Sequence, residues 1–301
     1  RHSISLMSNS WWEIKIDCAS ELEETIFWRL SEFGCKGMST QKQIQNILIS
    51  AYIPQIQVKL LEISDLLAQI DADAKNSDCQ IPITSCILID EEDWSSSWKQ
   101  HWAPQPIGDR LLINPAWLEV PKDTERIVLQ LDPGVAFGTG THATTQLCLE
   151  ALEMRLQPGT NLSIADIGCG SGILSTAALL LGAQQVYAVD NDPLAVKATR
   201  ENCQLNGIPP EKLIVELGSI ETLAMMIPAP LDGFVCNILA NVIIQMAPQM
   251  KDIVKPKGWA ALSGILSTQV ADVSTVLEQH GWVVGTVWNR QEWSCINLKL
   301  K

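Results

Sequence analysis

Paired cysteines, clustered histidines and long apolar runs are all missing from this 301-residue sequence. Its nine cysteines contain no Cys-x-x-Cys pair and its four histidines are isolated, so the sequence predicts neither a disulfide framework nor a metal site. No apolar stretch approaches the roughly 20 residues of a membrane-spanning helix, and no signal-peptide-like apolar region stands near the start. We therefore expect a protein without membrane contact, located in the cytoplasm, with reduced thiols.

Positive charge is scarce as well. The chain has 21 Lys and Arg residues against 34 Asp and Glu residues, which gives a net charge of −13 at pH 7. Because this charge repels a phosphate backbone, we expect no direct binding of nucleic acid, and a basic protein partner is favoured instead. Hydrophobic residues make up 47% of the sequence and charged residues 18%, which argues against disorder and indicates a sizeable core.

The first segment, residues 7–90, alternates short strand-like runs with two helix-like runs. This order predicts a small α/β sandwich of the ferredoxin-like kind. The spacing of Ser20 and Glu23 predicts a capping box at the start of the first helix, and Gly34 is expected to end that helix. The segment contains no catalytic motif.

A connector at residues 91–125 follows. Trp94, Trp98 and Trp102 recur every four residues, so a helix would place all three on one face. The simplest interpretation is that these rings pack the connector onto a neighbouring domain, because Trp usually anchors cores and interfaces. A substrate-binding aromatic strip is the alternative.

From residue 126 to residue 301 the pattern changes to strand, loop and helix, repeated several times. Such alternation predicts a mostly parallel, doubly wound sheet with helices on both faces. Two strand-like runs joined by the polar "NRQE" close the sequence and predict one antiparallel hairpin at the sheet edge.

The stretch "ADIGCGSGIL" places Gly168, Gly170 and Gly172 between a buried strand and a helix. Glycines here allow close approach of a ligand, and free N–H groups at a helix start favour an anion. The third glycine of the dinucleotide fingerprint is replaced by Ile173, which disfavours a nicotinamide-dependent oxidoreductase. No Gly-Lys-Ser/Thr sequence is present, so the chain has no P-loop either.

Two acidic residues follow the glycine loop, and we assign them different roles. Asp190 ends the next strand about 20 residues further on, where a carboxylate can accept hydrogen bonds from ribose hydroxyls. Asp192 precedes Pro193 and is expected to cap the following helix. An adenosyl group attached to a small zwitterion fits this pattern better than a pyrophosphate does, which indicates S-adenosylmethionine as the cofactor.

The motifs also carry a family resemblance. "DIGCGSGIL" and "VYAVDNDPLAV" are similar to the nucleoside-binding motifs of class I methyltransferases. Together with "LDPGVAFGTGTHATT", "NILANVI", "LSGIL" and "NRQEWSCINLK", they resemble the ribosomal protein L-eleven (L11) methyltransferase family. The resemblance implies three parts: a ferredoxin-like substrate-recognition domain at 7–90, a linker at 91–125 and a seven-stranded Rossmann-like methyltransferase domain at 126–301. It also implies methylation of lysine side-chain and N-terminal amines on one basic ribosomal protein.

The resemblance further implies which residues contact the cofactor. By analogy with the family, the stretch "FGTGTHATT" at residues 137–145 covers the cofactor opposite the glycine loop, and Thr145 contacts it from the start of a helix. Asn237, at the end of the strand "DGFVCN", lies where the transferred methyl group is expected; a simple turn-capping role is the alternative. Gly168, Gly170, Asp190, Thr145 and Asn237 are thus the predicted cofactor-binding residues. No catalytic base is assigned, because His142 belongs to the covering motif.

Other functions stay open at this point. A methyltransferase acting on a different protein or on RNA would carry the same cofactor motifs. A non-catalytic protein that binds S-adenosylmethionine would share them too, although a decayed enzyme usually loses some of them.

Overall fold

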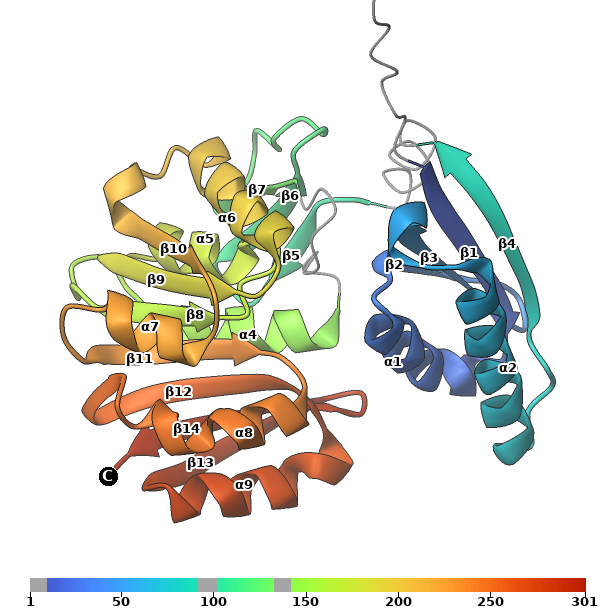
Figure 1. Ribbon diagram of the computed structural model, residues 1–301. Helices are drawn as coiled ribbons and strands as arrows, with labels where there is room; N and C mark the ends of the chain where they lie inside the picture. Colours follow the sequence, from blue (N-terminus) through green and yellow to red (C-terminus); the bar gives the residue numbers. More distant parts are fainter. Residues whose placement is uncertain (1–9, 91–101, 133–141) are drawn as a thin grey trace, which may run out of the picture. The chain divides into compact units, whose positions relative to one another are not determined.

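The computed structural model describes residues 10–90, 102–132 and 142–301, and it divides the chain into two compact units between Trp102 and Ala103 (Figure 1). Each unit has its own sheet and its own core. The predicted row of tryptophans falls largely outside the described residues: Trp94 and Trp98 are not among them, and Trp102 is half-buried.

The first unit is an antiparallel sheet of four strands in the order β2-β3-β1-β4, with two helices packed on one face (Figure 1). This arrangement confirms the ferredoxin-like prediction. In chain order the elements are β1 (Ser10–Cys18), α1 (Glu23–Phe33), β2 (Lys36–Lys42), β3 (Ile47–Pro54), α2 (Leu60–Asn76) and β4 (Ile83–Asp90).

The helices of the first unit are held by apolar spacing and by one ion pair. The buried positions of α2 recur every three or four residues, which is the period of one helix face: Ile63, Leu66, Ile70 and Ala74. The guanidinium of Arg29 on α1 donates two hydrogen bonds to the carboxylate of Asp73 on α2, at 2.7 and 3.0 Å. This bidentate geometry fixes the two helices side by side.

The predicted capping box of the first helix was wrong. A 3-10 turn (Ser20–Leu22) precedes α1, and the hydroxyl of Ser20 donates to the carboxylate of Glu21 at 3.4 Å. Glu23 is therefore the first residue of α1 and receives no bond from Ser20. The predicted end is confirmed, because Gly34 caps the helix in the left-handed conformation, with a φ of 99°.

The second unit contains a seven-stranded sheet in the order β10-β9-β8-β11-β12-β14-β13. The first five strands in this order are parallel, and β14 is antiparallel to both of its neighbours. This confirms the doubly wound prediction and the terminal hairpin. The strands are β8 (Ser163–Ile167), β9 (Gln185–Asp190), β10 (Leu213–Leu217), β11 (Leu231–Asn237), β12 (Val254–Leu266), β13 (Trp282–Arg290) and β14 (Trp293–Leu300).

Helices cover both faces of this sheet. On one face α4, α5 and α6 contact one another in a row, and on the other α7, α8 and α9 do so (Figure 1). Pro248 lies inside α8, which continues through it. The helices are α4 (Ala143–Arg155), α5 (Ile173–Leu180), α6 (Pro193–Leu205), α7 (Ile220–Met226), α8 (Ala240–Met250) and α9 (Val270–Gln279).

A smaller sheet of three strands completes the second unit. It consists of β5 (Gln105–Ile107), β6 (Leu111–Pro115) and β7 (Ile127–Leu131), with β6 and β7 parallel. Residues 103–125, which the sequence assigns to the connector, are thus part of the second unit. Strand β7 packs against α5 and α6 and leads toward the glycine loop.

The strand order determines where a ligand can bind. The chain leaves β8 toward β9 and β10 on one side, and later returns to β11 and β12 on the other. Neighbouring parallel strands that are followed in opposite directions leave a crevice at their carboxyl ends. The carboxyl ends of β8, β9 and β11 lie at that crevice, and they carry Gly168, Asp190 and Asn237.

Two leucines of α2 test the packing of the first unit. Leu66 is 4% exposed and Leu61 is 73% exposed, so the same Leu→Ala change removes core contacts at one position only. We expect Leu66→Ala to lower the free energy of unfolding by about 2–5 kcal/mol. Leu61→Ala should change it by no more than about 0.5 kcal/mol. Urea unfolding of the full chain, followed by circular dichroism, measures both, and equal losses would contradict the assignment of the core.

Candidate cofactor site

The glycine loop between β8 and α5 requires backbone conformations that other residues rarely adopt. Gly168, Gly170 and Gly172 all have positive φ angles, of 76°, 54° and 81°. The loop is also crowded, because a Cβ atom on Gly172 would lie 2.6 Å from the Cα atom of Thr199, and one on Gly168 would lie 2.6 Å from the side chain of Ile238. Conformation and space therefore both require glycine here.

Most N–H groups of this loop are bonded within the protein. The N–H groups of Gly168 and Cys169 donate to the carbonyl of Val189, and that of Gly172 donates to the carbonyl of Cys169. Only part of the sequence expectation is therefore met: the loop permits close approach, but it does not present a row of free donors to an anion. Because most of its N–H groups already donate hydrogen bonds within the protein, the loop suits an uncharged nucleoside better than a phosphate.

Asp190 connects the glycine loop to the start of α6. One carboxylate oxygen accepts the N–H of Gly170 at 2.9 Å, and the other accepts the N–H of Asp192 at 2.9 Å. A carboxylate has about four acceptor positions, so capacity remains for two hydroxyl donors. Asp192 has the predicted separate role, since its side chain caps α6 by accepting the N–H of Leu194, with Pro193 in the first turn.

Asn237 and Thr145 meet on the other side of the crevice. The side-chain amide of Asn237 donates to the hydroxyls of Thr145 at 3.2 Å and of Thr144 at 3.3 Å. Thr145 is 1% exposed, and the hydroxyl of Ser263 on β12 donates to the carbonyl of Thr144 at 2.9 Å. The first turn of α4 is thereby fixed against the ends of β11 and β12.

His142, not Thr145, caps α4. Its Nδ1 atom accepts the N–H of Thr144 at 3.3 Å and lies 2.7 Å from the hydroxyl of the same residue. The ring packs edge-on against Trp293, with centroids 5.2 Å apart. Burial lowers the pKa of His142 to about 4, so the ring is neutral at pH 7 and far too weak a base for an ammonium group.

Asp166 on β8 is a buried carboxylate behind the glycine loop. It is fully buried, accepts the hydroxyl of Ser175 at 2.7 Å, and its second oxygen has no hydrogen-bond partner. Burial raises the pKa of Asp166 to about 7, and the hydrogen bond from Ser175 opposes that shift in part. The sequence analysis did not single out Asp166, because an acidic residue inside a strand has no distinguishing spacing.

The hairpin between β13 and β14 braces α4 from behind. Arg290 donates to both carboxylate oxygens of Glu150 at 2.8 and 3.1 Å, and to the side chain of Gln146 at 3.2 Å. These contacts explain the position of the "NRQEW" motif, which the sequence analysis recognised without a role. They join residues 140 or more positions apart in the chain, so no local spacing could have predicted them.

The five predicted residues are thus brought to one edge of the sheet in two linked groups. Gly170 and Asp190 are hydrogen-bonded on one side, and Thr145 and Asn237 on the other. Ile238, which follows Asn237, touches the space beside Gly168 and joins the groups. Of the predicted covering residues 137–145, the first five, including Phe137, lie outside the described residues. Among the described residues, no three His, Cys, Asp or Glu side chains are grouped to hold a metal ion.

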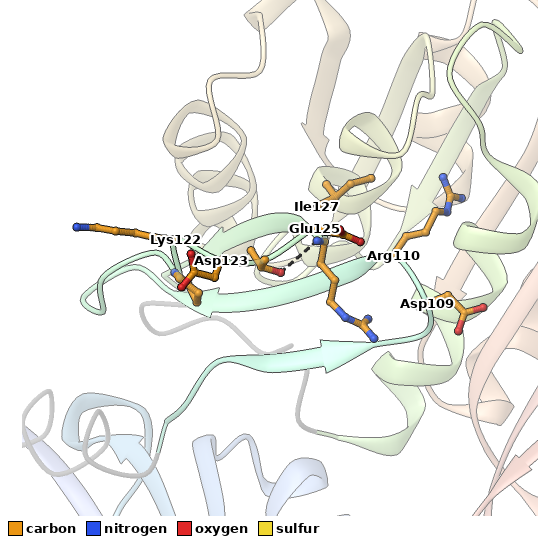
Figure 2. Close-up of a pocket in the computed structure, with 9 residues that line it drawn as sticks. Asp109, Arg110, Lys122, Asp123, Glu125 and Ile127 are labelled. Carbon is orange, nitrogen blue, oxygen red and sulfur yellow. Dashed lines mark hydrogen bonds between the residues drawn. The ribbon is translucent and has the colours of Figure 1, made fainter.

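A separate pocket of about 820 Å³ lies at the amino ends of β6 and β7 (Figure 2). Strand β7 separates it from Asp132, about 16 Å away along an extended strand. Figure 2 shows Lys122 and Asp123 at one end of the pocket and Asp109 and Arg110 at the other, so the charges do not converge. Arg110 is occupied by the carbonyls of Glu153 and Leu156. This pocket contributes nothing to the cofactor site.

The sheet order and the site together define a Rossmann-like class I methyltransferase domain preceded by a ferredoxin-like unit. The family model for ribosomal protein L11 methyltransferase matches residues 10–301. The chain therefore belongs to the ribosomal protein L11 methyltransferase family, whose members are enzymes that take the methyl group from S-adenosylmethionine.

Individual relatives agree with the family match. A ribosomal protein L11 methyltransferase of Cyanothece sp. is 53% identical and aligns over 97% of this chain and 99% of its own. One from Thermosynechococcus vestitus is 51% identical, with 98% and 99% covered. The crystal structure of a ribosomal protein L11 methylase from Lactobacillus delbrueckii subsp. bulgaricus superimposes with a TM-score of 0.60 at 29% identity, covering 66% of this chain and all of that one.

A comparison of two glycines distinguishes the effect of steric crowding from the effect of backbone strain. Gly172 and Gly207 both have positive φ angles, but a Cβ atom on Gly207 would meet nothing within 4 Å. We expect Gly207→Ala to lower the free energy of unfolding by about 1–2 kcal/mol. Gly172→Ala should lower it by about 2–5 kcal/mol and should also weaken S-adenosylmethionine binding, because the loop must move away from Thr199. Calorimetric titration and urea unfolding test this pair, and an unchanged affinity in Gly172→Ala would refute the crowding argument.

Asp166 gives a pH-dependent expectation. Its folded-state pKa of about 7 lies above the ordinary value, so the folded protein binds this proton more tightly than the unfolded chain does. The contribution to stability is then fully present below about pH 4 and is lost as the pH rises through about 7. Asp166→Asn, which stays neutral, should gain stability relative to the unmodified protein across that range. Urea unfolding at a series of pH values measures the difference, and a pH-independent difference would count against the buried carboxyl.

Proposed function

We propose that this chain methylates amino groups of ribosomal protein L11, both lysine side chains and the N-terminal amine, with S-adenosylmethionine as the donor. The observation that carries the proposal is the meeting of Gly170, Asp190, Thr145 and Asn237 at the switch point of the sheet, in a chain that belongs to this family. The relatives from Cyanothece sp. and Thermosynechococcus vestitus are named for the same substrate.

We assign the cofactor to five residues. Gly168 and Gly170 let the nucleoside approach the backbone, and the carboxylate of Asp190 accepts the ribose hydroxyls with the acceptor positions left by its two N–H bonds. Thr145 and Asn237 lie across the crevice and contact the methionine end. The residues fit the group, since Gly168 and Gly170 carry no Cβ atoms and two N–H bonds orient the carboxylate of Asp190.

When bound, S-adenosylmethionine supplies a methyl group attached to a sulfonium sulfur, and this sulfur is the leaving group, as a neutral thioether. The protein must therefore align an amine and accept it without its proton. A lysine with a pKa near 10.4 is neutral about once in a few thousand molecules at pH 7, which corresponds to about 4–5 kcal/mol. Desolvation lowers that pKa, and alignment in the crevice contributes the rest. Burial disfavours the charged forms of two groups near this edge of the sheet, since it lowers the pKa of His142 and raises that of Asp166.

The first unit is the proposed substrate-recognition domain, comprising residues 7–90. Support comes from the acidic balance of that segment, in which 12 Asp and Glu residues stand against 6 Lys and Arg residues and complement a basic ribosomal protein, and from the absence of predicted cofactor residues in it. All nine cysteines are free thiols, which suits a cytoplasmic location. In the described part of the chain, no helix is long and apolar enough to cross a membrane.

Asp190 and Asp192 provide a matched test of the site. Asp190→Asn removes one ribose acceptor and the charge, so S-adenosylmethionine affinity should fall about 10- to 100-fold. Asp192→Asn should leave the affinity within about twofold, because Asn caps helices as well as Asp does. Calorimetric titration measures both.

The same variants decide the substrate when the donor carries a labelled methyl group. The unmodified protein and Asp192→Asn should label the amines of ribosomal protein L11, and Asp190→Asn should lose most of the label at limiting donor. Label on a different ribosomal protein or on RNA would show that the proposed substrate is wrong. Donor binding without label on any macromolecule would overturn the proposed activity.

A further inference from the structure

Asn202, in the last turn of α6, has a buried side chain whose two N–H groups both donate hydrogen bonds. It is 1% exposed. Its amide nitrogen donates to the carbonyl of Asp132 at 2.8 Å and to the carbonyl of Ser171 at 2.7 Å, and its oxygen accepts the N–H of Asp132 at 2.9 Å. A planar amide that makes three such bonds fixes the relative positions of both partner segments.

The two segments lie 39 residues apart in the sequence. Ser171 belongs to the glycine loop, between Gly170 and Gly172. Asp132 follows β7 and stands directly before the stretch "PGVAFGTGTH". One side chain thus joins the loop that receives the nucleoside to the strand that leads into the second glycine-rich segment.

Asn206 makes a closely similar set of bonds one helical turn later. Its amide nitrogen donates to the carbonyls of Gln130 at 2.7 Å and of Asn202 at 2.8 Å, and its oxygen accepts the N–H of Gln130 at 2.8 Å. Both asparagines therefore hold β7 to α6 by pairing with its backbone. The difference is the third partner, which is the glycine loop for Asn202 and the helix itself for Asn206.

We infer that Asn202 is a positioning residue for the cofactor: it sets the glycine loop in register with the chain at Asp132. This inference rests on the proposed cofactor site. The loop is already packed against α6 at Gly172 and Thr199, and Asp190 holds Gly170 toward the start of the same helix. Asn202 adds the connection to β7, so the loop cannot shift along α6 without breaking a buried hydrogen bond.

The matched pair Asn202→Ala and Asn206→Ala tests the inference in the full-length protein. If Asn202 only stabilises the fold, both variants should lower the midpoint of thermal unfolding, and their affinities for S-adenosylmethionine should be equal. Positioning predicts that Asn202→Ala weakens S-adenosylmethionine binding by about tenfold, as for one lost hydrogen bond, while Asn206→Ala changes it less than about threefold. In steady state, the KM for the donor should rise in Asn202→Ala and the KM for the protein substrate should stay unchanged.

Equal affinities in the two variants would overturn the inference. If Asn202→Ala shows no cooperative unfolding transition, the pair Asn202→Ser and Asn206→Ser decides, because a hydroxyl can donate to only one of the two carbonyls. Asp190→Asn, measured alongside, distinguishes an error in the proposed cofactor site from an error in the role of Asn202. If that variant binds the donor normally, the proposed cofactor site is wrong; if it binds weakly and the asparagine variants do not differ, only the role of Asn202 fails.

Discussion

The carboxylate of Asp190 is shared by two backbone N–H groups, and the form of the cofactor site depends on this sharing. One N–H belongs to Gly170 in the loop after β8, and the other to Asp192 at the start of α6. A loop with three residues at positive φ would be conformationally costly if nothing held it. The acid holds it at one point, the carbonyl of Val189 at another, and the close contact of Gly172 with Thr199 at a third.

The pKa values of Asp166 and His142 shift in opposite directions, and both shifts have the same cause, which is burial. Burial raises the pKa of Asp166 to about 7 and lowers that of His142 to about 4, so in both cases the neutral form is favoured. An amine that enters such surroundings is also favoured in its neutral form.

Local spacing predicted the parts of the site that are local. Gly168, Gly170 and Asp190 follow successive strands, and Asp192 with Pro193 is a start of helix that a sequence shows directly. Asn202 escaped notice because its partners are backbone groups 31 and 70 residues away, which no pattern records. Strand β2 has no strand signal in its sequence, because "KGMSTQK" lacks apolar alternation, and the capping box at Ser20 failed because a 3-10 turn precedes α1. Pairing with β3, not the sequence of β2, makes that segment a strand.

The position of β14 has a consequence for biosynthesis. Strand β14 (Trp293–Leu300) lies between β12 and β13 and hydrogen-bonds to both, so the edge strand β13 reaches the sheet only through residues made after it. The first unit closes its four strands within residues 10–90 and can fold while the ribosome is still translating the remainder. The methyltransferase sheet is complete only after β14, which ends at Leu300, has been made. Until β14 is made, β12 has one unpaired edge, and the first unit can fold before the sheet of the second unit is complete.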